Sequence, residues 1–226
     1  MLRALSTVLI VGGCVLMADA GLTLAWQEPL SALYARITQD RLAGDLQALE
    51  RATPTELERR ALRNLPTERR RIAFLARSLR RKAKPGTAVG RIRIPHIHAN
   101  FVLVAGTDAA SLRKGPGIYS QTPFPGAPGT TGIAGHRTTY LAPFRHIDRL
   151  HRGNYIVLRM PYAQISYRVV RRRIVKPTAF WVIRRVSYDR LVLSACHPLY
   201  SAAKRIVVFA RLVSFVPRGA ALRSSG

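Results

Sequence analysis

One cysteine stands where a predicted β-strand ends. The apolar residues 191–195 are typical of a strand, and Cys196 follows them directly before His197-Pro198, which stops the run. A thiol held at a strand end is rigid and exposed, so Cys196 could act as a nucleophile. Arg205 opens the next apolar run nine residues later and could lie beside Cys196 if the two runs are antiparallel strands.

A histidine, His136, follows another predicted strand, residues 130–134. Histidine is the commonest general acid and base, and the fork of donors on an arginine can stabilise a developing oxyanion. Cys196, His136 and Arg205 could therefore supply a nucleophile, an acid–base group and an anion-binding group. Each residue also has a structural interpretation when taken singly: a buried thiol, a hydrogen-bonded turn histidine and a surface charge.

The second cysteine, Cys14, lies inside an apolar run that covers residues 4–26. As a helix this run would be about 35 Å long, enough to cross a bilayer, with Trp26 at the far boundary. The alternative is a cleaved signal peptide, since Ala-Asp-Ala at residues 18–20 fits a small-x-small cleavage site. Either way, the rest of the chain is predicted to lie outside the cytoplasm, and a disulfide between Cys14 and Cys196 is not expected.

Two kinds of element would have to position the site. Residues 28–83 are predicted to be helical, with breaks at Thr53-Pro54 and Leu65-Pro66. From residue 88 onward the pattern changes to short β-rich runs separated by turns, and Pro and Gly crowd residues 115–132. Many short strands without long helices between them are typical of a β-sandwich or a closed barrel.

The net charge is +26, from 37 Lys and Arg against 11 Asp and Glu, and so basic a surface attracts polyanions. Residues 86–226 contain only three acidic side chains, Asp108, Asp148 and Asp189. This scarcity argues against a calcium site and against glycoside hydrolysis by paired carboxylates. We expect no metal and no cofactor, because His96 and His98 could share a strand face but have no further ligand nearby.

Three spaced motifs resemble the signature of the sortase family: Gly135-His136-Arg137, the strand that ends at Cys196, and Arg205. The resemblance extends to residues 144–153 and to Ile94-Pro95, and it covers residues 88–215. Within the family, residues 135–140 and Cys196-His197-Pro198 look most like the class E type of high-GC Gram-positive bacteria.

The resemblance implies a mainly β fold, a closed eight-stranded β-barrel, and transpeptidation at the cell surface. Cys196 would attack the carbonyl between Thr and Gly of a sorting signal and form a thioester. His136 would act as general acid and then as base, and Arg205 would bind substrate and stabilise the oxyanion. An amine of a peptidoglycan precursor, or a pilin lysine, would resolve the thioester. Class E members prefer Leu-Ala-x-Thr-Gly to Leu-Pro-x-Thr-Gly, and we link Tyr119 to that preference.

One stretch departs from the family pattern. Sortases usually carry Thr-Leu-x-Thr before the cysteine, whereas residues 192–195 are Val-Leu-Ser-Ala. Ala195 lacks a hydroxyl that could position substrate, so we include it among the substrate-binding positions and expect it to affect rate and preference. Ser194 is not expected to replace that hydroxyl, because adjacent strand residues face opposite ways.

The sequence thus predicts a single-pass plasma-membrane protein with an extracellular catalytic domain. It would comprise an anchor or signal peptide (1–26), a helical basic stalk or linker (27–85), a sortase β-barrel (86–215) and a tail (216–226). Its expected partners are secreted proteins that carry a sorting signal, the amine acceptor, and the membrane through the N-terminal helix; nucleic acid is not expected.

The alternatives are a membrane-tethered basic module that binds polyanions, a sortase-like protein of reduced activity, and an L,D-transpeptidase. An L,D-transpeptidase would have Ser-x-Gly-Cys around its cysteine. In this chain the residue directly before Cys196 is Ala195 and not glycine.

Overall fold

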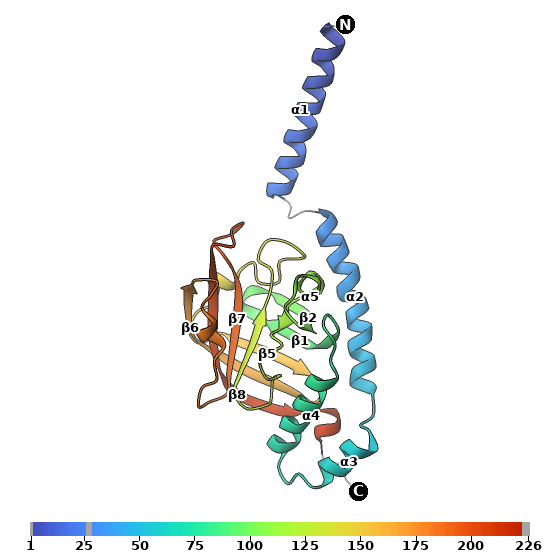
Figure 1. The fold of residues 1–226 in the computed structure, drawn as a ribbon, viewed down its shortest axis with the longest axis vertical. Coiled ribbons are helices and arrows are strands. Elements are labelled where there is room, and N and C mark those ends of the chain that lie inside the picture. The colour runs from blue at the N-terminus through green and yellow to red at the C-terminus, as the bar shows by residue number, and fades with distance from the viewer. Residues whose placement is uncertain (1, 26–28, 223–226) are drawn as a thin grey trace.

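A closed β-barrel forms the centre of the molecule (Figure 1). The computed structural model describes residues 2–25 and 29–222. The strands are β1 (Ala88–Ile94), β2 (Ala99–Ala105), β3 (Gly117–Ile118), β4 (Thr130–Ala134), β5 (Tyr155–Met160), β6 (Ala163–Val175), β7 (Arg190–His197) and β8 (Lys204–Pro217). They close in the order β1-β2-β3-β4-β7-β8-β6-β5, which confirms the predicted eight-stranded barrel.

Alternation along β7 decides which of its side chains fill the barrel. The interior side chains are Leu191, Leu193 and Ala195, all nearly inaccessible to solvent. Val192 lies on the outer side of the strand, where it packs with Val182 of the 3₁₀ helix η3 (Phe180–Ile183). Because successive strand residues face opposite ways, Ser194 and Cys196 share this outer face.

The helix α2 (Pro29–Arg51) lies along one side of the barrel (Figure 1). Its Leu42 and Leu46 are buried in a cluster with Val102 of β2. Gln39 completes the contact, because its Oε1 accepts a hydrogen bond from the Val102 amide at 2.7 Å and its Nε2 donates to the Lys114 carbonyl at 2.8 Å. These bonds satisfy backbone groups that no neighbouring strand reaches.

A second helix, α4 (Glu68–Lys82), supplies side chains to the main core. Its Ile72 and Ala76 are fully buried in the interior cluster. Residues 27–85, predicted as a stalk, are therefore largely helical, and both α2 and α4 pack against the barrel. The predicted breaks lie between helices: Thr55 caps α3 (Glu56–Arg63) in a capping box, and α4 begins after Leu65-Pro66.

The remaining elements are short. They are α5 (Ala109–Lys114), η1 (Pro95–Ile97), η2 (Ile147–Arg149) and η4 (Gly219–Ala221). η4 packs against α4, where the Arg71 guanidinium donates to the Ala221 carbonyl at 2.9 Å. The C-terminal segment after β8 is thereby attached to the same core as α4.

The N-terminal helix α1 (Leu2–Ala25) projects away from the barrel in Figure 1. The sequence predicted a membrane span over residues 4–26, of which Trp26 lies outside the described residues. Among the residues that the structure describes, no helix is both long enough and apolar enough to cross a membrane. The structure therefore does not confirm the predicted span.

Candidate active site

The strand register brings the three predicted catalytic residues to the same end of the barrel. Cys196 on β7 is the direct partner of Arg205 on β8. On the other side, Ala134, the last residue of the parallel strand β4, pairs with Ser194, and His136 follows two residues later in the loop after β4. The Gly135 amide continues this ladder by donating to the Ser194 carbonyl at 3.1 Å. Neighbouring strands are about 4.8 Å apart, so the backbone of Arg205 adjoins that of Cys196, and the loop that carries His136 continues the strand on the other side of β7.

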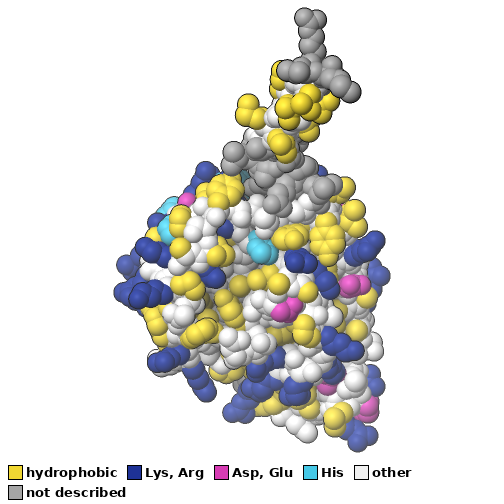
Figure 2. All heavy atoms as spheres, turned by 45° about the horizontal axis from the view of Figure 1, so that its top comes forward, with side chains coloured by type: hydrophobic (Ala, Val, Ile, Leu, Met, Phe, Trp, Pro, Cys, Tyr) yellow, Lys and Arg dark blue, Asp and Glu magenta, His cyan; other side chains and the backbone are white. Residues whose placement is uncertain are grey.

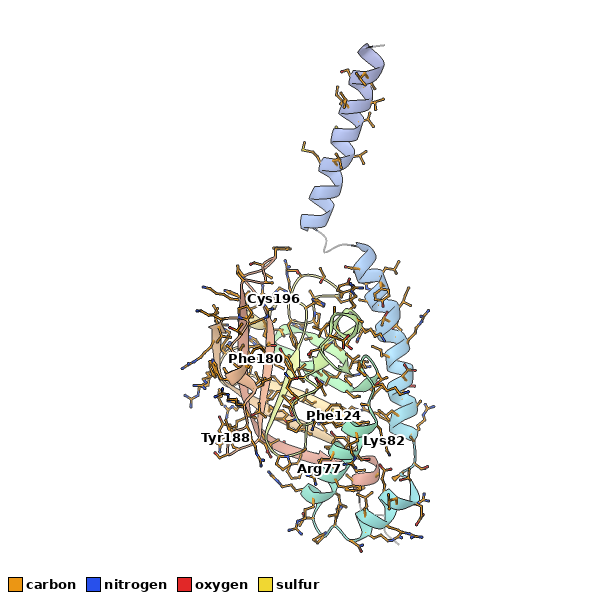
Figure 3. All side chains as sticks on the ribbon, viewed as in Figure 1. Arg77, Lys82, Phe124, Phe180, Tyr188 and Cys196 are labelled. Atoms are coloured by element: carbon orange, nitrogen blue, oxygen red, sulfur yellow. The ribbon has the colours of Figure 1, made fainter. Side chains whose placement is uncertain are left out.

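Cys196 is partly exposed near one end of the barrel, at the top in Figure 3. Its strand β7 pairs with β8 over its whole length, Cys196 included, and with β4 from Arg190 to Ser194. The backbone is therefore rigid at the nucleophile while the thiol stays open to solvent. This arrangement suits a nucleophile better than the buried small hydrophobe that the sequence left as an alternative.

The backbone around His136 is set by a close packing contact. A Cβ atom on Gly135 would lie 2.7 Å from the ring of the fully buried Phe144, so only glycine fits there. The Phe144 amide donates to the His136 carbonyl at 3.0 Å, and the ring of Tyr140 lies 5.2 Å from the imidazole centroid. The Nε2 atom of His136 is buried and has no hydrogen-bond partner among the described residues. No protein group among the described residues therefore occupies this nitrogen.

We expect the imidazole of His136 to titrate below its ordinary pKa of 6.5. The main cause is burial, which disfavours the charged imidazolium, and the Arg113 guanidinium lowers the pKa further. A step in which His136 donates a proton should therefore slow as the pH rises through this lowered pKa.

An NMR titration of the His136 ring measures this pKa directly. Arg113→Gln should raise the midpoint toward the ordinary value, whereas Arg63→Gln on the distant helix α3 should leave it unchanged. A wild-type midpoint at or above 6.5 would contradict the assignment.

Arg205 lies on the same strand face as Cys196, since directly opposed residues of an antiparallel pair project to the same side. Its Nη1 atom donates to the carbonyls of Ala202 at 2.8 Å and of Lys204 at 3.0 Å. These bonds tie the guanidinium to its own turn and orient the group. The other donors of the fork, Nε and Nη2, are the ones that could contact a substrate.

A second arginine of this region, Arg137, was missed as a functional residue by the sequence reasoning. Its side chain is only 3% exposed, and its Nη2 atom pairs with Asp148 Oδ1 at 2.9 Å. Its Nη1 atom lies 3.3 Å from Nδ1 of His197, the residue after Cys196. Arg137 thus connects the histidine loop, η2 and the end of β7. The scarcity of acidic residues was the available signal, because Asp148 is one of only three after residue 86.

Asp148 is the partner that compensates the buried Arg137 charge. Burial opposes ionisation of this carboxyl, but the hydrogen bond and the charge of Arg137 prevail and hold its pKa below the ordinary 3.8. The carboxylate is therefore ionised throughout the neutral range. Its ion pair is with Arg137, so Asp148 stabilises the arginine and does not orient His136.

The structure separates the two predicted substrate-binding positions. Tyr119 follows β3, and its hydroxyl lies 2.8 Å from the hydroxyl of Ser194, which is on the outer face of β7 with Cys196. The Tyr119 ring also covers Gly132 of β4, where a Cβ would lie 2.7 Å from it. Ala195, in contrast, is buried in the barrel interior, so its methyl group faces away from the Cys196 side.

The histidines outside this site show no arrangement for a metal. The rings of His96 and His151 meet edge to face with centroids 4.7 Å apart. Within residues 2–25 and 29–222, no three His, Cys, Asp or Glu side chains gather closely enough to hold a metal ion.

A closed β-barrel with a strand-end cysteine between a histidine and an arginine defines the class of cysteine transpeptidases. The comparisons agree: a family model for the sortase domain matches residues 92–213. The chain belongs to the sortase family, whose members are cysteine transpeptidases.

Individual relatives cover the same part of the chain. Sortase D of Bacillus subtilis (strain 168) is 31% identical over 137 residues, which are 59% of this chain and 68% of that protein. Sortase SrtE1 of Streptomyces coelicolor is 25% identical over 151 residues and matches over 43% of its own length. The solved structure of sortase E from Streptomyces avermitilis aligns with a TM-score of 0.54 and 28% identity, covering 59% of this chain and 93% of that one. These relatives are sortases of the D and E types.

Proposed function

We propose that this sortase cleaves a sorting signal of the type Leu-Ala-x-Thr-Gly or Leu-Pro-x-Thr-Gly between Thr and Gly. The observation that supports the proposal is the strand register: Arg205 pairs directly with Cys196, and β4, which leads into His136, pairs with β7 as far as Ser194.

In the first half of the reaction, the thiolate of Cys196 attacks the threonine carbonyl while His136 is protonated, and a tetrahedral oxyanion develops. The free donors of Arg205 stabilise this negative charge. The C–N bond then breaks, and His136 gives its proton to the departing glycine amine, which leaves a thioester on Cys196.

In the second half, the neutral imidazole of His136 takes a proton from an incoming amine. That amine attacks the thioester carbonyl, a new amide bond forms, and the thiolate of Cys196 leaves. The lowered pKa of His136 favours this half, because a neutral imidazole is the form that accepts a proton. We propose an amine of a peptidoglycan precursor or a pilin lysine as the acceptor.

Tyr119 is proposed to select the residue before x in the signal. Its ring covers Gly132 and its hydroxyl meets Ser194, so it borders the face on which Cys196 lies. A tyrosine there narrows the space over the strand floor and presents a hydroxyl to the peptide. Alanine in the signal keeps its backbone N–H as a donor to such a hydroxyl, whereas proline has none.

The proposed setting is the outer side of the plasma membrane, with sorting-signal proteins as partners. This rests on the family and on the apolar N-terminal run of the sequence. Fractionation of cells with and without protease treatment tests it. Recovery of the full chain in the membrane fraction with a protease-sensitive barrel supports an anchor, and recovery of a shortened chain in the medium supports a cleaved leader.

The activity is tested by incubating the full chain with each of the two peptides and an amine donor. Arg205→Lys is expected to lower kcat by about 10²–10³, because lysine cannot reproduce the planar fork of donors. Arg211→Lys on the same strand is the matched control and should keep full activity, since it is remote from the Cys196 level. Full activity of Arg205→Lys would refute the role assigned to Arg205.

The full chain is the right material for this assay. A fragment that begins at residue 86 would lack α4, whose Ile72 and Ala76 belong to the barrel core. Product formation with neither peptide would favour the alternative of a sortase-like protein with reduced activity. The fold and the family assignment do not depend on that outcome.

A further inference from the structure

A cavity outside the active site is lined by three arginines of α4. Its volume is about 440 Å³, within the range of small-molecule sites. Arg77, Arg80 and Arg81 form one wall, and Phe124 and Ala105 contribute to the apolar remainder. Figure 3 shows Arg77 and Phe124 toward the α4 side of the barrel, away from Cys196 near the other end.

The spacing of the arginines places them together. Positions i, i+3 and i+4 of a helix share one face, so the Arg77, Arg80 and Arg81 side chains project in the same direction. All three are exposed in the free protein. Like charges so close to one another are mutually unfavourable, and a bound anion would relieve that repulsion.

The cavity arginines differ in their ion pairing from other basic residues of α4. Arg69 pairs with Asp189 at 2.6 Å, and Lys82 pairs with Glu58 at 2.6 Å. For the three cavity arginines, no ion pair with any carboxylate of the described residues is formed. One of them, Arg80, has its Nη2 atom on the Ser120 carbonyl at 2.8 Å. The fold therefore supplies carboxylates to the ends of α4 and none to the cavity.

Basic side chains also outnumber acidic ones on the wider surface. Figure 2 shows many Lys and Arg side chains on the visible face and few Asp or Glu. General basicity attracts any polyanion, but it does not make a site. What distinguishes this place is a hollow that combines three guanidinium groups with an apolar floor.

We propose that this cavity binds a phosphate group carried on an organic moiety. The planar fork of arginine matches phosphate oxygens in a bidentate manner, and three forks on one wall can surround one phosphate. Phe124 and its apolar neighbours would contact the organic part. A phosphate ester of a cell-envelope polymer and a phospholipid headgroup share this chemistry. The site is separate from Cys196 and does not depend on the transpeptidase proposal.

Binding is tested by calorimetry with glycerol 3-phosphate and the full chain at low ionic strength. The variant is Arg77→Gln with Arg81→Gln, since glutamine keeps helix propensity and both side chains are exposed. The control is Arg152→Gln with Arg173→Gln, two exposed arginines elsewhere with the same loss of charge. We expect affinity to fall about tenfold or more in the first variant and to change less than about twofold in the control.

Two further arms identify the source of the phosphate. One uses soluble glycerol phosphate oligomers, and the other uses phosphatidylcholine vesicles with and without phosphatidylglycerol. If the double variant Arg77→Gln with Arg81→Gln loses binding in one arm and the control double variant does not, the site is supported. The arm in which binding is lost then identifies the source of the phosphate. Equal weakening by both double variants would overturn the proposal, because only net charge would then matter. Equal competition by succinate, or no binding of any phosphate probe, would overturn it as well.

Discussion

Replacing His136 with alanine is expected to lower kcat/KM for transpeptidation by about two to four orders of magnitude. His136 lies in the loop that follows β4, two residues beyond the last β4–β7 pair, Ala134 with Ser194, and its buried Nε2 atom has no partner among the described residues that would compete for its proton. Without the imidazole, the departing amine must take its proton from water. The barrel itself should be unaffected, because the core contact in this loop is made by Phe144 against Gly135.

The comparison variant for His136 is His96→Ala. His96 is an exposed residue of η1 whose ring contacts that of His151, so its loss should leave kcat/KM within about twofold, as for other surface changes. Steady-state kinetics with a fluorogenic sorting peptide measures both. A loss of less than tenfold in His136→Ala would show that another group transfers the proton.

The second large effect concerns stability. Asp148→Asn is expected to lower the free energy of unfolding by about 2–3 kcal/mol, somewhat less than the loss of a fully buried partner. The reason is that Arg137 is buried and keeps its charge, so the guanidinium is left without a carboxylate. The value is reduced because the Asp148 side chain is 47% exposed and water partly screens the pair.

Substitution of the other partner, Arg137, is expected to lower the free energy of unfolding by less. Arg137→Met removes the buried charge and leaves Asp148 half exposed, where water can solvate it. The contact with His197 is also lost, so kcat should fall even at temperatures well below the melting point. Arg149→Met, an exposed neighbour, should stay within about 0.5 kcal/mol of the wild type. Urea unfolding measures all three, and a larger loss for Arg137→Met than for Asp148→Asn would contradict this asymmetry.

The Asp148–Arg137 pair also makes the free energy of unfolding depend on pH, and the direction of that dependence follows from the pKa of Asp148. The folded pKa of Asp148 lies below its ordinary 3.8. The pair therefore contributes its full stabilisation above that ordinary value and loses it as the pH falls through the lower folded pKa. In Asp148→Asn this part of the acid destabilisation should be absent.

The barrel could be predicted, and the three candidate catalytic residues could be singled out, because their signals are local. Apolar runs that stop at Gly135 or at His197-Pro198 mark strand ends, and the motif spacing linked residues 136, 196 and 205. Alternation correctly separated Ser194 from Ala195. It could not say which of them faces the interior, since both faces of β7 are covered, one by the core and one by η3.

Long-range packing was beyond reach of the sequence. The apolar stripe of α4 fits a free amphipathic stalk as well as a docked helix, and only the structure shows Ile72 in the barrel core. The pairing of Arg137 with Asp148 spans two motifs that look unrelated in the chain. The docking of Gln39 on the edge of β2 has no local signature, because a single polar residue on a helix is normally a solvated one.

The central claim is that Cys196 forms a thioester with a sorting signal. It is tested by incubating the full chain with Leu-Ala-x-Thr-Gly peptide, without an amine donor, and measuring the intact protein mass. We predict an adduct equal to the peptide up to its threonine, mapped to Cys196, released by hydroxylamine and absent from Cys196→Ala. An adduct that persists in Cys196→Ala, or folded wild-type protein without adduct from either this peptide or Leu-Pro-x-Thr-Gly, would contradict the account.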